Sequence, residues 1–268
     1  MTIERCQGTI KIHQREYIER TLQKFGMNEC KAVGTPMDPG VKSQIEMHQP
    51  TEEEIQEGKN LPYLEAVGSL LYISQISRPD IAYAVNFVSS FNKNACNIHW
   101  NAVKRIFRYL KGTLDYKLSF KKNAEHNIVG YNDADWANDP KTRRSITGTT
   151  FTMCGGAISL YSKRQRTVAL STVEAEYMAL AFSCQEGLWL RNLQKEIEPK
   201  TSNQPMRIYS DSSGAVNLSK NAITRQRTKH IDVRHHFVQE KVEAGIITVQ
   251  HLSSEEIVVD RWDKWNKR

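Results

Sequence analysis

The most informative segment of this chain is Asn127-Ile128-Val129-Gly130-Tyr131-Asn132-Asp133-Ala134-Asp135-Trp136. Its first half is apolar, which is typical of a buried strand, and its second half carries acids. A carboxylate at the end of a central strand is held rigidly and is desolvated on one side, which is where a metal-dependent enzyme places a ligand. Residues at alternate positions of a strand share a face, so the pattern leaves both Asp133 and Asp135 as candidates.

Three further segments place acids in similar settings. Glu174 and Glu176 lie in a helical pattern, Asp211 follows an apolar strand pattern, and Asp260 follows Val258-Val259. Two divalent metal ions about 4 Å apart need several carboxylates from different elements, so these acids could together hold two Mg²⁺ ions.

Each acid also has a simpler explanation. Asp211 precedes Ser-Ser-Gly and, considered alone, is better explained as a helix cap. Asp260 could be an ordinary surface acid. Glu174 and Glu176 flank the same apolar stripe, and periodicity does not choose between them.

Composition restricts the class of protein. The chain has 268 residues, a net charge of +7 and a pI near 9.1, which suit one or two soluble domains and favour an anionic partner such as nucleic acid. Its five cysteines form no Cys-x-x-Cys pair, so we expect neither a disulfide framework nor a zinc knuckle. No apolar run approaches the roughly 20 residues of a membrane span, and no secretory signal is evident, so we expect no membrane partner.

The first 120 residues are predicted to be mostly helical. A short strand over 8–13 precedes a helix over 14–27, and the Gly/Pro cluster at 34–40 ends this piece. Residues 41–60 are polar and acid-rich, which predicts a linker, although Thr51-Glu-Glu-Glu54 could form a capping box. Apolar stripes then predict helices beginning near Tyr63 and Pro79, and a third over 97–111.

From residue 114 the apolar period changes to two. Strands are predicted over 114–120, 128–133, 145–153 and 157–161. A helix over 172–195 follows, then a strand over 206–210, helices over 212–221 and 231–244, a strand over 246–252, and a helix that could begin at Ser253 or Ser254. This order predicts an α/β domain in which helices pack on a mixed sheet.

Basic residues surround the candidate acids. A polyanion would have its backbone held by such positive loops, while a solvated surface explains any single residue equally well. His230 and His235 are five residues apart, which does not suit a helical zinc site. The candidate nucleic-acid contacts are Arg105, Arg108, Arg143, Arg144, Lys163, Arg164, Arg166, Lys229 and His230.

Six motifs occur in order along the chain and resemble the C-terminal part of the Pol polyprotein of copia-type LTR retrotransposons. The motifs span Tyr63–Tyr72, Ser77–Val85, Arg105–Asp115, Gly130–Ala137, Ser171–Leu180 and Lys229–Phe237. The resemblance implies that residues 1–40 are the end of a reverse-transcriptase thumb and 41–60 a linker. It further implies a mostly helical connection region over 61–124 and a ribonuclease H-like α/β domain over 125–268, with a mixed sheet and flanking helices.

The same resemblance implies an activity and a site. The activity is hydrolysis of the RNA strand of RNA–DNA hybrids with two Mg²⁺ or Mn²⁺ ions. Asp133 matches the first catalytic Asp, and Asp211 matches the strand-end Asp. Glu176 lies in the Ala-Glu-Tyr-Met motif, which selects it over Glu174. Asp260 matches the last acid, in a Val-Asp pair where the family usually has Ala-Asp.

Two departures from the family pattern accompany these matches. The tail over 261–268 differs from the family, which predicts a short or altered final helix, and no Asp-Asp dipeptide occurs, so we expect no polymerase activity. The alternatives are an inactive relic that binds nucleic acid, or a chain that docks on an intact reverse transcriptase in trans. Such elements assemble in cytoplasmic particles, which is the expected location, with the nucleus as the alternative.

Overall fold

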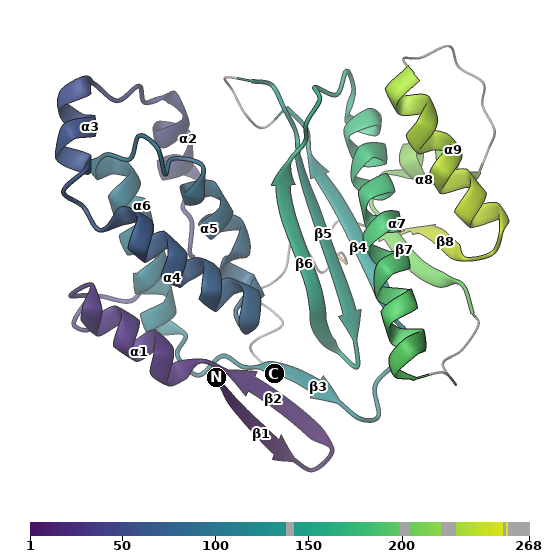
Figure 1. Cartoon of the computed structure of the whole chain (residues 1–268), viewed down its shortest axis with the longest axis horizontal. Helices are drawn as coiled ribbons and strands as arrows, with labels where there is room; N and C mark the ends of the chain where they lie inside the picture. The colour runs from purple at the N-terminus through teal and green to yellow at the C-terminus, as the bar shows by residue number, and fades with distance from the viewer. Residues whose placement is uncertain (138–141, 199–203, 221–228, 254–255, 257–268) are drawn as a thin grey trace. The chain divides into compact units, whose positions relative to one another are not determined.

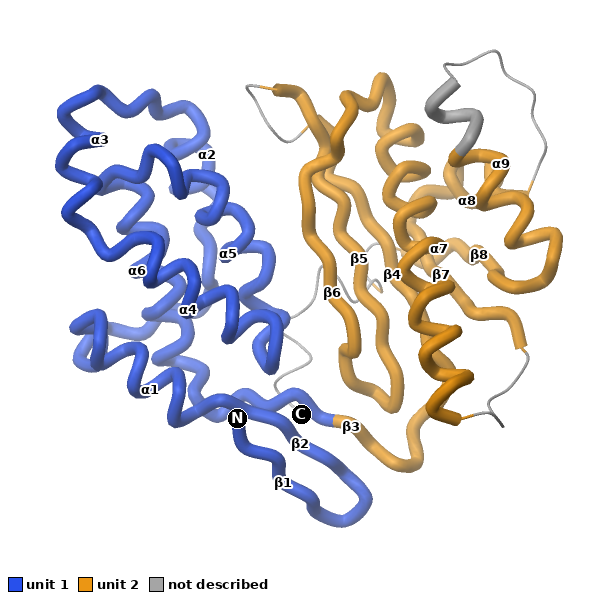
Figure 2. Tube along the Cα trace, in the orientation of Figure 1, with its two compact units in different colours: residues 1–119, 263–268 blue, residues 120–262 orange. Residues whose placement is uncertain are grey.

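The structure is a computed structural model that describes residues 1–137, 142–198, 204–220, 229–253 and 256, without the side chains of 229–233 (Figure 1). The chain divides into two compact units, residues 1–119 and 120–262 (Figure 2). Each unit has its own hydrophobic core. None of the described helices is both long enough and apolar enough to cross a membrane.

Unit 1 combines a small sheet with a helical core. The hairpin strands β1 and β2 pair in antiparallel register, and β3 completes a sheet of order β1-β2-β3. Its elements are β1 (Thr2–Cys6), β2 (Thr9–His13), α1 (Arg15–Lys24), α2 (Pro39–Met47), α3 (Glu52–Gly58), α4 (Tyr63–Ile76), the 3₁₀ turn η1 (Pro79–Ile81), α5 (Ala82–Ser89), α6 (Asn97–Gly112) and the first half of β3 (Leu118–Lys121), whose last two residues belong to unit 2. The helices expected from near Tyr63, from Pro79 and over 97–111 are observed as α4, as η1 with α5, and as α6. The strand expected over 114–120 is the shorter β3.

The segment 41–60, which we expected to be a linker, is largely helical. Asp38 caps α2 by accepting a hydrogen bond from Gly40 N–H at 2.9 Å, and Ile45 is buried in the core. The capping box that opens α3 is present, with reciprocal bonds between Thr51 and Glu54. Helix caps and one buried Ile stabilise this segment. Because such features add little hydrophobic periodicity to a sequence, the pattern did not indicate helices here.

Gly58 ends α3 at a close approach to the chain before α6. A Cβ at this position would lie 1.9 Å from Ala95 O, whereas a Cβ at Gly68 in α4 would meet nothing within 4 Å. We therefore expect Gly58→Ala to destabilise the protein by about 1–3 kcal/mol, because backbone must move. Gly68→Ala is expected to be neutral or to stabilise by up to about 1 kcal/mol through helix propensity. Urea unfolding of both variants tests this, and equal stability of the two would contradict the packing.

A buried ion pair holds the middle of unit 1. The Arg78 and Asp80 side chains are each 1% exposed, and Arg78 Nη2 donates to Asp80 Oδ2 at 2.7 Å. Arg78 Nη1 also donates to Thr113 O at 3.0 Å, and Tyr109 OH donates to Asp80 Oδ2 at 2.9 Å. The motif Ser77-Arg-Pro-Asp80 therefore connects α4, η1 and α6.

Unit 2 is a mixed five-stranded sheet of order β6-β5-β4-β7-β8 with three described helices. The pairs β4–β5 and β5–β6 are antiparallel, while β4–β7 and β7–β8 are parallel, which confirms the predicted mixed sheet. Its elements are β4 (Val129–Asp135), β5 (Ile146–Met153), β6 (Gly156–Arg164), α7 (Thr172–Ile197), β7 (Met206–Ser210), α8 (Ser213–Lys220), α9 (Lys229–Glu243) and β8 (Ile247–His251).

Helix α7 packs closely on the central strand β4 because small residues line their contact. Ala134, Ala169, Ala175 and Ala179 form a buried cluster with Met178. The larger core of the unit contains Phe151, Leu180, Cys184 and Ile208, all of them fully buried. The close approach matters for function, since it brings the first turns of α7 to the acidic end of β4.

Candidate active site

Three acids from separate elements meet in unit 2. Asp133 lies in β4, Glu176 in α7, and Asp211 directly after β7. One carboxylate oxygen from each lies within 4.8 Å of the other two. The register explains the meeting of the two aspartates: Asn132 pairs with Ser210 in the parallel β4–β7 ladder, so the next residue on each strand is an Asp at the same edge of the sheet.

The other candidate acids are placed differently. Asp135 is exposed near the end of β4, opposite Ile146, and does not belong to the three-acid cluster. Asp260 lies outside the described residues.

Glu174 and Glu176 have separate positions although they share a helix. Glu174 completes the N-terminal cap of α7: its Oε2 accepts from Leu170 N–H at 2.9 Å, and its own N–H donates to Ser171 Oγ at 3.2 Å. Glu176 is only 8% exposed, and its Oε1 accepts from Ala134 N–H at 3.1 Å. The backbone of β4 therefore fixes the Glu176 carboxylate next to Asp133, while Glu174 serves the helix.

His251 is a site residue for which the sequence suggested no role. Its Nε2 donates to the backbone carbonyl of Asp211 at 3.0 Å, and it pairs with Ser210 across the parallel β7–β8 ladder. The imidazole thereby positions the loop that carries Asp211. The only sequence signal was a His at the end of the strand that neighbours the Asp211 strand.

The aromatic residue beside Glu176 connects α7 to α9. Tyr177 is buried, its hydroxyl donates to His235 O at 3.3 Å, and the two rings stack with centroids 5.4 Å apart. Burial raises the pKa of Tyr177 well above its usual range, so the phenol stays protonated and remains a donor. Tyr177 thus has a structural role at the edge of the acidic cluster.

A groove of about 350 Å³ with basic walls lies on unit 2, and we refer to it as the basic groove. Its cations are Lys163, Arg164, Arg166 and Arg234. Lys163 and Arg164 belong to β6, which runs three residues beyond the strand end predicted at residue 161.

Contacts among side chains fix the lining of the basic groove. Tyr161 and Phe182 stack in its wall with ring centroids 4.1 Å apart. Gln165 is buried in its floor and donates to Ala175 O at 2.9 Å. The groove is therefore joined to α7 one residue before Glu176.

The remaining predicted contacts lie elsewhere. Arg143 and Arg144 are exposed next to an undescribed segment, and the side chains of Lys229 and His230 on the first turn of α9 are not among those described. In unit 1, Arg105 Nη2 donates to Thr35 Oγ1 at 2.9 Å and Arg108 Nε donates to Lys31 O at 2.7 Å. These two arginines therefore have a structural role, because their hydrogen bonds connect α6 to the loop before α2.

The acidic cluster fits a divalent metal. Three carboxylates that converge within 4.8 Å repel one another unless a cation lies between them, and oxygen-only donors suit Mg²⁺ or Mn²⁺. Asp133, Glu176 and Asp211 are the residues that would hold it.

The fold and this site together are a mixed sheet with acids at the ends of two neighbouring strands and a third acid on the helix that packs on its central strand. Among solved structures, the chain is similar to LC11-RNase H1 in complex with an RNA/DNA hybrid. The TM-score is 0.36 at 17% identity, over 51% of this chain and 93% of that one. No family model matches the chain.

Sequence similarity identifies the family. The chain is 42% identical over 261 residues to the retrovirus-related Pol polyprotein from transposon TNT 1-94 of Nicotiana tabacum. This match covers 97% of the chain and 19% of the polyprotein. The chain belongs to the retrovirus-related Pol polyproteins of copia-type plant transposons and spans about a fifth of their length.

A second relative is much shorter. The secreted RxLR effector protein 161 of Plasmopara viticola is 50% identical over 132 residues, which cover 49% of this chain and 93% of that protein. Sequence of this kind therefore also makes up nearly the whole of a small protein.

Proposed function

We propose that unit 2 is a metal-dependent nuclease that hydrolyses the RNA strand of RNA–DNA hybrids. The observation that carries this proposal is the convergence of Asp133, Glu176 and Asp211, whose ligand oxygens lie within 4.8 Å of one another. Membership of the Pol family supports it, because the chain is 42% and 35% identical to two such polyproteins over 97% of its length.

Each residue of the site has a separate role in the proposed reaction. Bound Mg²⁺ supplies a more acidic water and stabilises charge on the scissile phosphate. Asp133 and Asp211, on neighbouring strand ends, hold the cation. Glu176 accepts a hydrogen bond from Ala134 N–H and would complete the set. It would also accept a hydrogen bond from the 2′-hydroxyl, the group that distinguishes RNA from DNA. His251 keeps the Asp211 backbone in position.

The basic groove supplies binding without sequence preference. Lys163, Arg164, Arg166 and Arg234 present four cations near the N-terminal half of α7. Phosphate contacts of this kind set the register of a nucleic acid and make its affinity fall with salt. In our proposal one strand of the hybrid follows this groove while the other crosses the acids.

The test is cleavage of an end-labelled RNA–DNA hybrid, with duplex DNA and duplex RNA in parallel, in Mg²⁺ or Mn²⁺. We expect cleavage of the RNA strand of the hybrid alone, leaving 3′-hydroxyl and 5′-phosphate ends. Asp211→Asn should abolish it while leaving the fold intact. Hybrid binding without cleavage by folded wild-type protein would replace this proposal with a nucleic-acid-binding function, and equal cleavage by Asp211→Asn would reveal a contaminating nuclease.

His251 provides a milder perturbation of the same site. We expect His251→Ala to lower kcat by about 10–100-fold, the usual cost of losing a group that orients a metal ligand. His251→Gln retains an N–H donor and should recover part of the rate. A full rate for His251→Ala would show that the bond to Asp211 O has no part in catalysis.

A further inference from the structure

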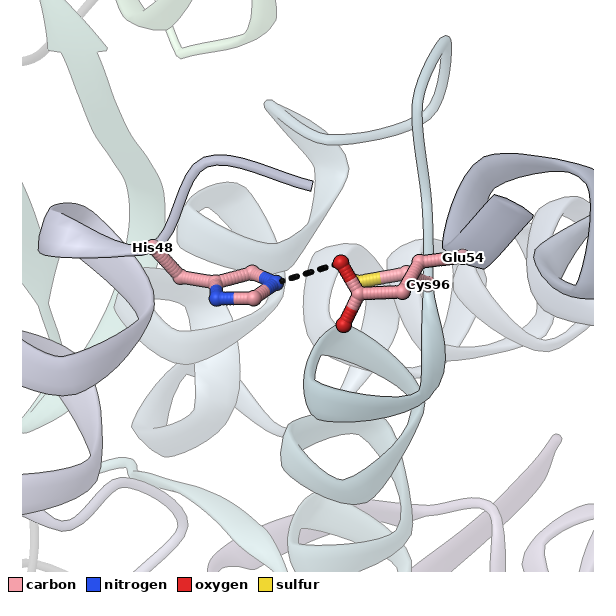
Figure 3. A group of neighbouring side chains, drawn as sticks. All are labelled: His48, Glu54 and Cys96. Atoms are coloured by element: carbon pink, nitrogen blue, oxygen red, sulfur yellow. Dashed lines mark ion pairs between the residues drawn. The ribbon is translucent and has the colours of Figure 1, made fainter. Parts of the chain in front are cut away.

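Three chemically different ligand groups meet in unit 1, far along the chain from the acidic cluster. They are His48, Glu54 and Cys96, and one ligand atom of each lies within 4.8 Å of the others (Figure 3). All three occupy helix ends: His48 is the C-cap of α2, Glu54 is the third residue of α3, and Cys96 is the N-cap of α6. The sequence predicted no zinc knuckle because it lacks a Cys-x-x-Cys pair, and this cluster needs only one Cys.

The imidazole of His48 faces the carboxylate of Glu54. His48 Nε2 lies 3.2 Å from Glu54 Oε2, which is an ion-pair distance. The same oxygen, Oε2, also accepts from Thr51 N–H at 2.8 Å, which fixes the carboxylate.

The thiol of Cys96 is held beside this pair. Cys96 is 1% exposed, its N–H donates to His99 Nδ1 at 3.1 Å, and its Sγ lies 3.2 Å from the same nitrogen. The first turn of α6 carries a partial positive charge that favours an anionic ligand atom at the N-cap. Gly58 allows α3 to approach Ala95 closely, which brings the Glu54 helix against the Cys96 turn.

Each group has an ordinary explanation alone. A buried free Cys is commonly a small apolar core residue, and a half-exposed His–Glu pair contributes little. The combination is less ordinary, because nitrogen, oxygen and sulfur atoms from three helix ends point to one place. Figure 3 shows the imidazole and the thiol directed toward the same carboxylate.

We propose that His48, Glu54 and Cys96 form a Zn²⁺ site in unit 1. Imidazole, carboxylate and thiolate are the donors that Zn²⁺ takes, whereas Mg²⁺ takes oxygen. Tetrahedral zinc with normal bond lengths separates its ligand atoms by about 3.3–3.7 Å. The His48–Glu54 distance of 3.2 Å is already close to that range. Because the three ligand atoms lie within 4.8 Å of one another, Sγ would have to close at most about 1.5 Å to reach that range.

Bound zinc would stabilise the fold of unit 1. Binding replaces the thiol proton of Cys96, which leaves to solvent, and water fills the fourth position. The ion would join the ends of α2, α3 and α6, and two of these helices form the segment that looks like a linker in the sequence. Metal binding of this kind adds to the free energy of unfolding.

The test uses the full chain with Asp133→Asn and Asp211→Asn, which removes the acidic cluster as a competing site. Co²⁺ is titrated into the chelator-treated, reduced protein and then displaced by Zn²⁺. We expect one equivalent of Co²⁺ with thiolate-to-cobalt charge-transfer absorption and intense tetrahedral d–d bands. We also expect a higher Tm with Zn²⁺ than with EDTA.

The variants preserve local structure. Cys96→Ser keeps an N-cap for α6 and should lose the charge-transfer band, while His48→Gln and Glu54→Gln should each weaken Zn²⁺ binding at least about tenfold. The amide oxygen introduced by Glu54→Gln can still accept from Thr51 N–H, so the cap of α3 survives. The matched controls are Cys154→Ser, which removes a Cys whose Sγ lies 3.8 Å from His126 Nδ1, and Glu52→Gln in the same turn as Glu54.

The outcomes are distinct. Loss of the band in Cys96→Ser with no change in either control supports the site. The proposal is overturned if the protein that retains His48, Glu54 and Cys96 gives no charge-transfer band with Co²⁺. It is equally overturned if the band disappears in the Cys154→Ser variant. It is also overturned if neither His48→Gln nor Glu54→Gln weakens Zn²⁺ binding.

Discussion

Replacing Glu176 by Gln is expected to lower the rate of hybrid cleavage at least about a hundredfold, since a carboxylate that holds a catalytic metal supports several kcal/mol of transition-state stabilisation. Gln has nearly the same shape, and its amide oxygen can still accept from Ala134 N–H, as Glu176 Oε1 does at 3.1 Å. The change therefore removes charge with little change in packing. Single-turnover cleavage at saturating enzyme measures the effect apart from binding.

Glu174→Gln is the matched control, two residues away on the same helix. Its Oε2 accepts from Leu170 N–H, a bond that Gln can also make, so we expect cleavage near the wild-type rate. The pair of variants also separates catalysis from folding. Without metal, Glu176→Gln should be at least as stable as wild type, because it relieves repulsion within the cluster. A large rate loss in Glu174→Gln, or none in Glu176→Gln, would contradict the assignment.

The second large effect is on stability. We expect Arg78→Met to destabilise the protein by about 3–5 kcal/mol, because it leaves the Asp80 carboxylate buried without its partner. The Asp80 side chain is 1% exposed, and Tyr109 OH alone would remain as a donor among those described above. Urea unfolding followed by circular dichroism gives the free energy of unfolding directly.

A double-mutant cycle sharpens this prediction. Asp80→Leu together with Arg78→Met removes both charges, and the double variant should be much less destabilised than the sum of the two single variants. Arg15→Met is the control, since Arg15 forms an exposed ion pair with Asp115 and its loss should leave stability nearly unchanged. Strict additivity in the cycle would show that the two side chains do not depend on each other.

The sheet and the long helix of unit 2 could be predicted because their hydrophobic periods are strong. Helix α7 begins at the predicted Thr172, and β7 matches its prediction at both ends. Hydrophobic periodicity could not choose between Glu174 and Glu176, since both flank one apolar stripe. It depends on which carboxylate reaches Ala134 N–H, a contact between residues 42 positions apart.

Two features escaped prediction for a related reason. Helix α2 is held by its cap and by the buried Ile45 rather than by an apolar face, so the polar composition of 41–60 predicted a linker, in which only the capping box of α3 was anticipated. The roles of His48 and His251 depend on partners in other elements, Glu54 and Asp211. A single His carries no local signal of such a partner.

The parallel pairing of β4 with β7 has a consequence for synthesis of the chain on the ribosome. Val129 pairs with Arg207, so β4, β5, β6 and α7 all emerge before the strand that covers the second edge of β4. Until then that edge is an unpaired row of backbone donors and acceptors, the surface through which nascent chains stick to one another. Asp211 arrives with the covering strand. The pairing of β7 therefore both covers the exposed edge of β4 and completes the acidic cluster, so the three acids converge only after that strand has been synthesised.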